Sequence, residues 1–194
     1  MSNLLFSNAA AIVLAGGKST RMGGPDKSML DVNGQPMIQY ITAQLKPLFG
    51  AVFVGSSDVA KYSFLGLPVV PDKTPGMGPL MGIASCLEAS PFDVNFITAC
   101  DIPVMNAEFI GRLIEAAADA DIVIPVRDDG RYEPLYAVYR RGVAGKAEAL
   151  LGAGEYKISE LFSLVNTKYI PFPWGDWYHN INYRDDYLRF TGNG

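Results

Sequence analysis

Glycines and two cationic side chains follow an apolar segment near the start of the chain. The run Ala9–Val13 predicts a buried strand, and Leu14–Lys27 then reads LAGGKSTRMGGPDK. Glycine lets backbone N–H groups approach an anion closely. Arg21 can bind two phosphate oxygens at once, and Lys27 adds a point charge. A strand, a glycine loop and two cations together predict a nucleoside triphosphate site.

Two further classes of nucleotide-binding loop fit this segment less well. Its spacing matches neither G-x-G-x-x-G nor G-x-x-x-x-G-K-[ST], so a dinucleotide-binding fold and a P-loop NTPase are not the first choice. A solvated turn with incidental charges would also produce glycines and cations. However, many residue types that bind phosphate coincide directly after a strand here.

An aspartate follows the segment that should form the central strand. The apolar run Asn95–Cys100 is followed by Asp101, Ile102 and Pro103. In α/β proteins, ligands bind at the carboxyl ends of parallel strands. A carboxylate opposite a triphosphate loop is a natural Mg²⁺ ligand, because Mg²⁺ takes one or two carboxylates with phosphate oxygens and waters. From spacing alone, a turn or capping aspartate before the next helix is an equal alternative.

A third segment is rich in glycine and proline. Residues 72–83 read DKTPGMGPLMGI, which disfavours regular structure at the start and suits a loop that closes over a flat ligand. Asp72 opens the segment, and a carboxylate there could accept hydrogen bonds from a ligand. A plain turn aspartate is the alternative for this residue.

Composition favours one globular α/β domain over residues 1–194. Sixteen basic and twenty acidic residues give a net charge of −4, so we expect no broad nucleic-acid footprint. No apolar run approaches the ~20 residues that span a bilayer, so we expect a soluble cytoplasmic protein that binds no membrane. The two cysteines, Cys86 and Cys100, lie in apolar segments and should be reduced core thiols.

Strand-like and helix-like segments alternate along the chain. The alternation predicts a single Rossmann-like domain with a mostly parallel sheet and helices on both faces. The expected strands are Ala11–Leu14, Ala51–Val54, Val69–Val70, Asn95–Cys100, Ile122–Pro125, Tyr136–Tyr139 (crossing back) and Thr167–Pro171. The expected helices are Met37–Phe49, one starting at Gly82–Leu87, Ala107–Ala118 with a start at Asn106, Ile158–Leu164 and Arg184–Phe190.

The first loop resembles the opening of the molybdenum cofactor guanylyltransferases, within the wider nucleotidyltransferase family. That opening is L-A-G-G-x-x-x-R-M-G-G-x-D-K, continued by x-x-G-x-P-(L/M)-I, and Asn33–Ile38 supplies the continuation as NGQPMI. The resemblance is strongest in residues 12–38 and 76–103. It implies transfer of GMP from GTP to the phosphate of molybdopterin, with Mg²⁺ as cofactor. Cofactor-delivery proteins and molybdoenzymes would then be further partners.

The resemblance also implies roles for individual residues. Cys100–Pro103 matches the family's C-D-x-P, which makes Asp101 the metal ligand and, with Arg21 and Lys27, a catalytic residue. Residues 78–82, GPLMG, resemble the family's G-P-L-A-G beside the base. Ser56 stands near a position where the family has an asparagine. The nucleotide-binding set that the resemblance implies is Leu14, Ala15, Gly16, Gly17, Lys27, Ser56, Asp72, Gly78 and Asp101.

Two asparagines near the end of the chain complete the expected site. His179–Asn182 reads HNIN and resembles the family's N-V-N-T, although Tyr183-Arg184 stands where Thr-Pro is common. Asn182 is expected beside Asp101 at the metal as a neutral oxygen ligand. The alternation puts Asn180 and Asn182 on one face of an extended segment, and the resemblance implies that both bind the acceptor. An asparagine-rich turn is the alternative.

The acceptor phosphate and the exact reaction leave further alternatives. Arg131 or Lys157 could receive the pterin phosphate, and spacing does not decide between them. A molybdenum cofactor cytidylyltransferase, a sugar-1-phosphate nucleotidylyltransferase and a nucleotide-binding module without turnover are the rival functions. The double glycine Gly16-Gly17 favours guanine over cytosine, because cytidylyl relatives usually carry L-A-A-G. Retention of Arg21, Lys27 and Asp101 argues against a module that has lost turnover.

Overall fold

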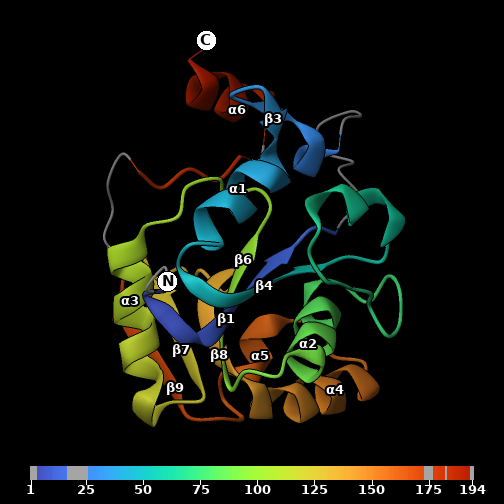
Figure 1. Ribbon diagram of the computed structural model, residues 1–194. Helices are drawn as coiled ribbons and strands as arrows, with labels where there is room; N and C mark the ends of the chain where they lie inside the picture. The colour runs from blue at the N-terminus through green and yellow to red at the C-terminus, as the bar shows by residue number, and fades with distance from the viewer. Residues whose placement is uncertain (1–3, 17–25, 173–176, 182, 193–194) are drawn as a thin grey trace.

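Most of the chain is described in a computed structural model, namely residues 4–16, 26–172, 177–181 and 183–192 (Figure 1). Within these residues seven strands form one sheet in the order β5-β4-β1-β6-β8-β7-β9. In chain order they are β1 Phe6–Leu14, β4 Phe49–Gly55, β5 Val69–Val70, β6 Val94–Ala99, β7 Ile122–Val126, β8 Tyr136–Arg140 and β9 Thr167–Pro171.

The sheet is parallel except for one strand. β8 runs antiparallel to both of its neighbours, β6 and β7, while the other pairs are parallel. This confirms the predicted mostly parallel sheet and the strand that crosses back. The amino end of β8 therefore lies at the same sheet edge as the carboxyl ends of the other strands.

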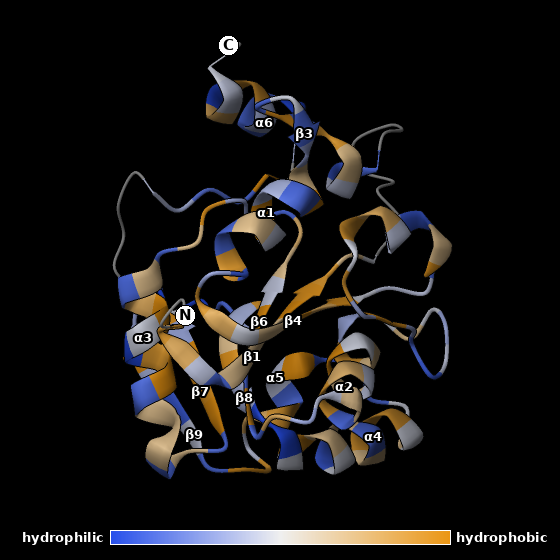
Figure 2. Ribbon diagram, viewed as in Figure 1, coloured by the Kyte–Doolittle hydropathy of each residue, from blue (hydrophilic) through white to orange (hydrophobic). Residues whose placement is uncertain are grey.

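Helices cover both faces of the sheet, as predicted. They are α1 Met37–Leu45, α2 Pro79–Ala89, α3 Ala107–Ala116, α4 Ala144–Gly152, α5 Ile158–Leu161 and α6 Arg184–Thr191. Successive strand residues point to opposite faces, so Val13 lies in one core with α1 and α3, and Ile12 lies in the other with α2, α4 and α5. Figure 2 shows β4 and β7 in hydrophobic colours, as expected for strands buried on both faces.

Short elements connect the main ones. Within the described residues, four 3-10 helices span Lys27–Met29 (η2), Ala60–Leu65 (η3), Ala117–Asp119 (η4) and Arg141–Val143 (η5). A hairpin of β2, Asp31–Val32, and β3, Gln35–Pro36, leads into α1. α6 lies beside this hairpin (Figure 1), where the Tyr187 hydroxyl donates to the Asp31 carbonyl at 2.6 Å.

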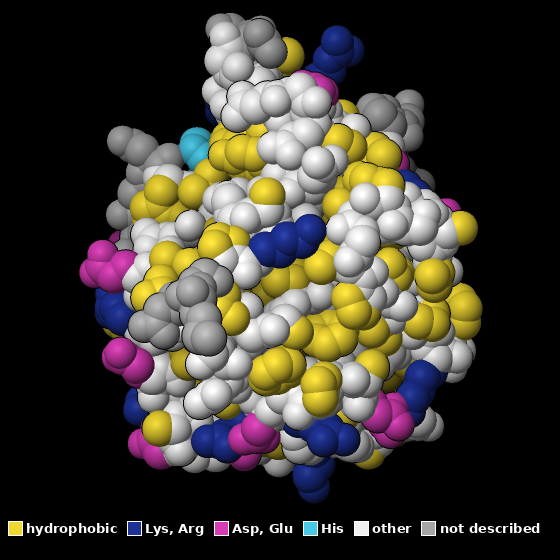
Figure 3. Space-filling model, in the orientation of Figure 1, with side chains coloured by type: hydrophobic (Ala, Val, Ile, Leu, Met, Phe, Trp, Pro, Cys, Tyr) yellow, Lys and Arg dark blue, Asp and Glu magenta, His cyan; other side chains and the backbone are white. Residues whose placement is uncertain are grey.

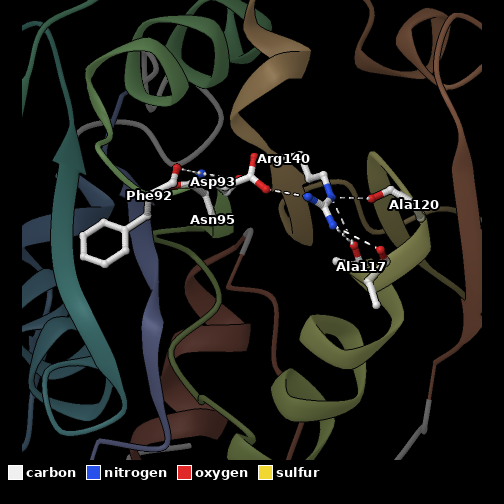
Figure 4. Close-up of polar contacts among 7 residues, drawn as sticks. Phe92, Asp93, Asn95, Ala117, Ala120 and Arg140 are labelled. Atoms are coloured by element: carbon white, nitrogen blue, oxygen red, sulfur yellow. Dashed lines mark hydrogen bonds and ion pairs between the residues drawn. The ribbon is translucent and has the colours of Figure 1, made fainter.

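Arg140 makes several polar contacts at the edge of the sheet opposite the carboxyl ends of its parallel strands. The Arg140 guanidinium donates to the carbonyl of Ala117 at 2.8 Å and to that of Ala120 at 3.1 Å, and it pairs with the Asp93 carboxylate (Figure 4). Cationic donors suit the last carbonyls of a helix, which lack partners within the helix. Arg140 therefore joins the end of α3 to the start of β6.

Some predicted boundaries are wrong. The sequence predicts a first helix that reaches Phe49, but α1 ends at Leu45, because Pro47 cannot supply an N–H to continue it. Phe49 instead starts β4. The third helix ends at Ala116 and α5 at Leu161, both short of the predicted ends, whereas the Asn106 side chain caps α3 as expected by accepting from the Phe109 N–H at 3.0 Å.

The sequence did not predict α4. Its residues, AGKAEALLG, include two glycines and only a weak apolar stripe, so propensity and periodicity both fail to mark it. Ala144, Ala147 and Leu151 are buried in the core that α2 shares, so tertiary packing stabilises this helix. Both cysteines are free thiols, as predicted, and burial raises the pKa of Cys86 to about 12.

The surface carries charges of both signs. In the view of Figure 3, basic and acidic side chains alternate along the end of the molecule that carries α4. Two ion pairs on this surface join Lys73 to Glu88 and to Glu148. None of the helices within the described residues has both the length and the apolarity that a bilayer span requires.

Candidate active site

Four predicted site residues follow neighbouring strands at one edge of the sheet. Asp72 comes after β5, Ser56 after β4, Ala15 after β1 and Asp101 after β6. The register aligns these ends, because Leu14 of β1 pairs with both Gly55 and Ala99. The fold therefore brings together side chains that are up to 86 positions apart (Ala15 to Asp101) in the sequence.

Lys27 and Asp101 face each other at this edge. The Lys27 Nζ lies 3.8 Å from an Asp101 carboxylate oxygen, and their side chains are only 17% and 25% exposed. Burial raises the pKa of Asp101, and the attraction of Lys27 opposes that rise. A sheltered carboxylate of this kind would gain from a further cation, while the adjacent ammonium suits an anion. Asp101 could therefore hold a metal ion while Lys27 holds the phosphate bound to that ion.

Local hydrogen bonds fix the backbone around Lys27. Asp26 caps η2, and its carboxylate accepts from the Ser28 N–H at 2.9 Å and from the Ser28 hydroxyl at 2.7 Å. The Leu30 N–H donates to the Lys27 carbonyl at 3.2 Å. A lysine flanked by two anchored residues loses little backbone freedom on binding an anion.

Asp72 lies against the first turn of α2. A methyl group built onto Gly82 would stand 3.5 Å from the Asp72 carboxylate and 3.4 Å from the Leu14 side chain. The Ser57 hydroxyl donates to the other oxygen of Asp72 at 3.1 Å. Gly78 caps α2 with a φ of 78°, a conformation that favours glycine. The structure thus groups Asp72 and Leu14 with the start of α2.

Ser56 is buried and already hydrogen-bonded. It is 5% exposed, and its hydroxyl accepts from the Asp58 N–H at 3.2 Å. The side chain therefore stabilises its own turn beside β4. Gly16 is exposed, and nothing lies within 4 Å of a methyl group built onto it.

The segment near the end of the chain reaches the same edge. The Ile181 N–H donates to the Asp101 carbonyl at 2.8 Å, which places the neighbour of Asn180 directly beside the central strand. The Asn180 side chain hydrogen-bonds the Tyr178 hydroxyl. Gly17, Arg21 and Asn182 lie outside the described residues, so their predicted roles stay predictions.

A polar cluster that the sequence did not predict supports this segment. The Tyr178 hydroxyl donates to one Glu133 oxygen at 3.0 Å, and Arg127 donates to the other at 3.0 Å. Burial and the charge of Glu133 raise the pKa of Tyr178, so the phenol stays a donor. Arg127 follows β7 and Glu133 precedes β8, so only the reversal of β8 brings both to this edge. No spacing in the sequence marks such a pair.

The two cationic side chains that could bind the acceptor phosphate, Arg131 and Lys157, line one cavity. A cavity of about 510 Å³ is bounded by Arg131, Lys157, Tyr132 and Tyr156. It reaches Pro79, the first residue of α2, which follows Gly78. Sequence spacing leaves Arg131 and Lys157 as alternatives. The structure places both on one cavity that adjoins the start of α2.

The fold is that of nucleotidyltransferases. Residues 11–167 match the family described as the MobA-like NTP transferase domain, and the chain belongs to that family. A protein of Carboxydothermus hydrogenoformans named probable molybdenum cofactor guanylyltransferase is 35% identical over 168 residues, which cover 86% of this chain and 83% of that protein. The molybdenum cofactor guanylyltransferase of Serratia proteamaculans is 30% identical over 189 residues, or 96% of this chain and 95% of its own.

Solved structures share the same fold. The crystal structure of molybdopterin-guanine dinucleotide biosynthesis protein A from Archaeoglobus fulgidus superposes with a TM-score of 0.78 at 25% identity, covering 94% of this chain and 97% of that one. A nucleotidyl transferase from Methanothermobacter thermautotrophicus, at 18% identity, has a TM-score of 0.70 over 95% of this chain and 96% of its own. The predicted family and fold class are confirmed.

Proposed function

We propose that this protein transfers GMP from GTP to the phosphate of molybdopterin and releases pyrophosphate. The observation that carries the proposal is the Lys27–Asp101 pair at the edge of β1 and β6, in a chain whose relatives are named molybdenum cofactor guanylyltransferases. An oxygen of the acceptor phosphate attacks the α-phosphorus of GTP. The bond from that phosphorus to the bridging oxygen breaks, and its electron pair leaves with pyrophosphate.

The acceptor is already a nucleophile, so no catalytic triad is needed. Catalysis then depends on in-line positioning and on neutralising charge. Lys27 would hold the triphosphate, with Arg21 as its proposed partner. Leu14, Ala15, Gly16 and Gly17 would bring backbone groups to the phosphates, and Asp72, Ser56 and Gly78 would lie around the base.

The donor set at Asp101 fits Mg²⁺. Among the described residues no group of three or more histidine, cysteine or carboxylate side chains could hold a metal alone. Mg²⁺ commonly takes one or two carboxylates and completes its shell with phosphate oxygens and waters. Asp101 would hold the ion, joined by Asn182 in our proposal, and the bound ion would neutralise charge on the triphosphate.

The acceptor would approach from the side of Asn180 and the cavity of Arg131 and Lys157. Asn180 and Asn182 would bind it through their side-chain amides. The two cations on the cavity suit a phosphate, and Tyr132 and Tyr156 suit a flat heterocycle. Delivery proteins and molybdoenzymes are proposed further partners, in the cytoplasm.

A donor screen tests the proposed function. The protein is incubated with molybdopterin, Mg²⁺ and one of GTP, ATP, CTP or UTP, and the dinucleotide product and pyrophosphate are measured. We expect product from GTP alone, because a site that hydrogen-bonds one base edge rejects bases that leave its polar groups unpaired. Equal use of the four nucleotides, or a preference for CTP, would contradict the assignment.

A further inference from the structure

The hydroxyl of Tyr62 contacts both ends of the segment from Ala15 to Ser28, which we propose binds the triphosphate. Tyr62 lies in η3, between β4 and β5, and is 1% exposed. Its hydroxyl donates to the Ala15 carbonyl at 3.2 Å and lies 2.9 Å from the Ser28 hydroxyl. Ala15 directly follows β1, and Ser28 directly follows Lys27. One buried phenol therefore contacts both the entry to the loop and its exit.

These contacts are tightly coupled. The Ser28 hydroxyl also donates to the Asp26 carboxylate, and Tyr62 also hydrogen-bonds the Ser56 side chain, so the phenol belongs to one connected group of polar side chains. A shift of either hydroxyl must change the other contacts. Burial raises the pKa of Tyr62, so the phenol remains protonated and able to donate.

Lys61, the neighbour of Tyr62, contacts the residue that precedes Lys27. The Lys61 ammonium pairs with the Asp26 carboxylate and lies 5.0 Å from the centre of the Tyr62 ring. Asp26 is the residue that caps η2 around Lys27. Two consecutive residues of η3 thus hold the residues on either side of Lys27, while Lys27 itself faces Asp101.

We infer that Tyr62 is a positioning residue for GTP binding, which sets the place of Lys27 relative to the end of β1 through Ser28 and Ala15. This inference rests on the proposed function, in which Lys27 binds the triphosphate. Tyr62 touches no reacting atom. It reduces the number of arrangements open to the loop ends before the nucleotide arrives, so its loss should weaken nucleotide binding.

A double-mutant cycle tests the inference. Tyr62→Phe keeps the ring and removes the hydroxyl with its contacts to Ala15 and Ser28, and we expect GTP affinity measured by calorimetry to fall roughly three- to tenfold. In a Lys27→Ala background the same change should have almost no effect on GTP affinity, because the group that Tyr62 positions is absent. The rate constant at saturating GTP should change much less than the affinity.

Tyr136→Phe is the matched control. Tyr136 is also fully buried, and its hydroxyl accepts from the backbone N–H of Asn106, at the start of α3. Tyr136→Phe loses this backbone contact and Tyr62→Phe loses its contacts with Ala15 and Ser28, so both should lower the melting temperature. Only Tyr62→Phe should weaken GTP binding.

Two results would overturn the inference. One is wild-type GTP affinity in Tyr62→Phe. The other is an equal loss of affinity with and without Lys27, which would mean a purely structural role. Failure of the proposed function is distinguishable, since the wild-type protein would then form no dinucleotide from GTP and molybdopterin.

Discussion

The backbone N–H of Ile181 donates to the carbonyl of Asp101 at 2.8 Å, so the segment near the end of the chain adjoins the carboxyl end of the central strand. Asp101, which we propose as the metal ligand, and the segment of Asn180, which we propose binds the acceptor, are therefore linked through main-chain atoms. Because neither side chain makes this contact, substitutions at Asp101 can test its carboxylate while leaving the link in place.

Replacing Asp101 by asparagine should nearly abolish GMP transfer. The change removes the charge at similar volume, and loss of an electrostatic group of this kind costs on the order of 10²–10³ in rate. Product formation should be measured together with a thermal melt. Wild-type turnover in Asp101→Asn would show that the carboxylate is not needed for the chemistry.

The same substitution should change how stability depends on pH. Burial raises the pKa of Asp101 in the folded protein above its unfolded value, so ionisation of this group removes stability as pH rises through the two pKa values. Asp101→Asn lacks this term. Denaturant unfolding of the nucleotide-free protein at pH 3 to 7 should show the mutant gaining stability relative to wild type as pH rises. A constant difference across that range would mean that the folded-state pKa is not raised.

Removing the hydroxyl of Tyr178 should weaken acceptor binding specifically. Tyr178 contacts Glu133 and holds the Asn180 side chain, so Tyr178→Phe should raise the KM for molybdopterin about three- to tenfold and leave the KM for GTP unchanged. Tyr187→Phe is the control, because its hydroxyl contacts Asp31 beside α6. A parallel rise in both KM values would instead indicate general loosening of the site.

Arg140→Met should lower stability without affecting nucleotide binding. The substitution removes a guanidinium that contacts the Ala117 and Ala120 carbonyls and Asp93, and we expect the free energy of unfolding to fall by on the order of 2 kcal/mol. The adjacent, exposed Arg141 provides the control, since Arg141→Met should stay within about 0.5 kcal/mol of wild type. Reduced GTP affinity in Arg140→Met would contradict the separation of this edge from the site.

The sequence predicted the sheet and the helices on both faces, and it marked Lys27, Asp101 and Asp72 as candidates that the fold places at one edge of the sheet. These followed from local signals: apolar runs mark buried strands, and glycine loops and carboxylates at strand ends mark a ligand site. That residues 1–194 form one domain stays a prediction, as does the set of ligands around Mg²⁺.

Several features could not be predicted because they depend on tertiary contacts. The Glu133–Tyr178 contact joins residues 45 positions apart, and the Ser28–Tyr62 contact joins residues 34 apart. The first contact depends on the reversed strand β8, and the second depends on the pairing of β1 with β4. The helix α4 has a weak pattern of its own and forms because α2 provides the surface that buries it.

The reversed strand β8 also divides the sheet into two halves. On one side, β5, β4, β1 and β6 end in the residues that we assign to the nucleotide. On the other, the loop between β7 and β8 carries Arg131, Tyr132 and Glu133. If the acceptor reaches this loop as we propose, exchanging the loop should redirect nucleotidyl transfer to other phosphates and leave the donor half of the sheet intact.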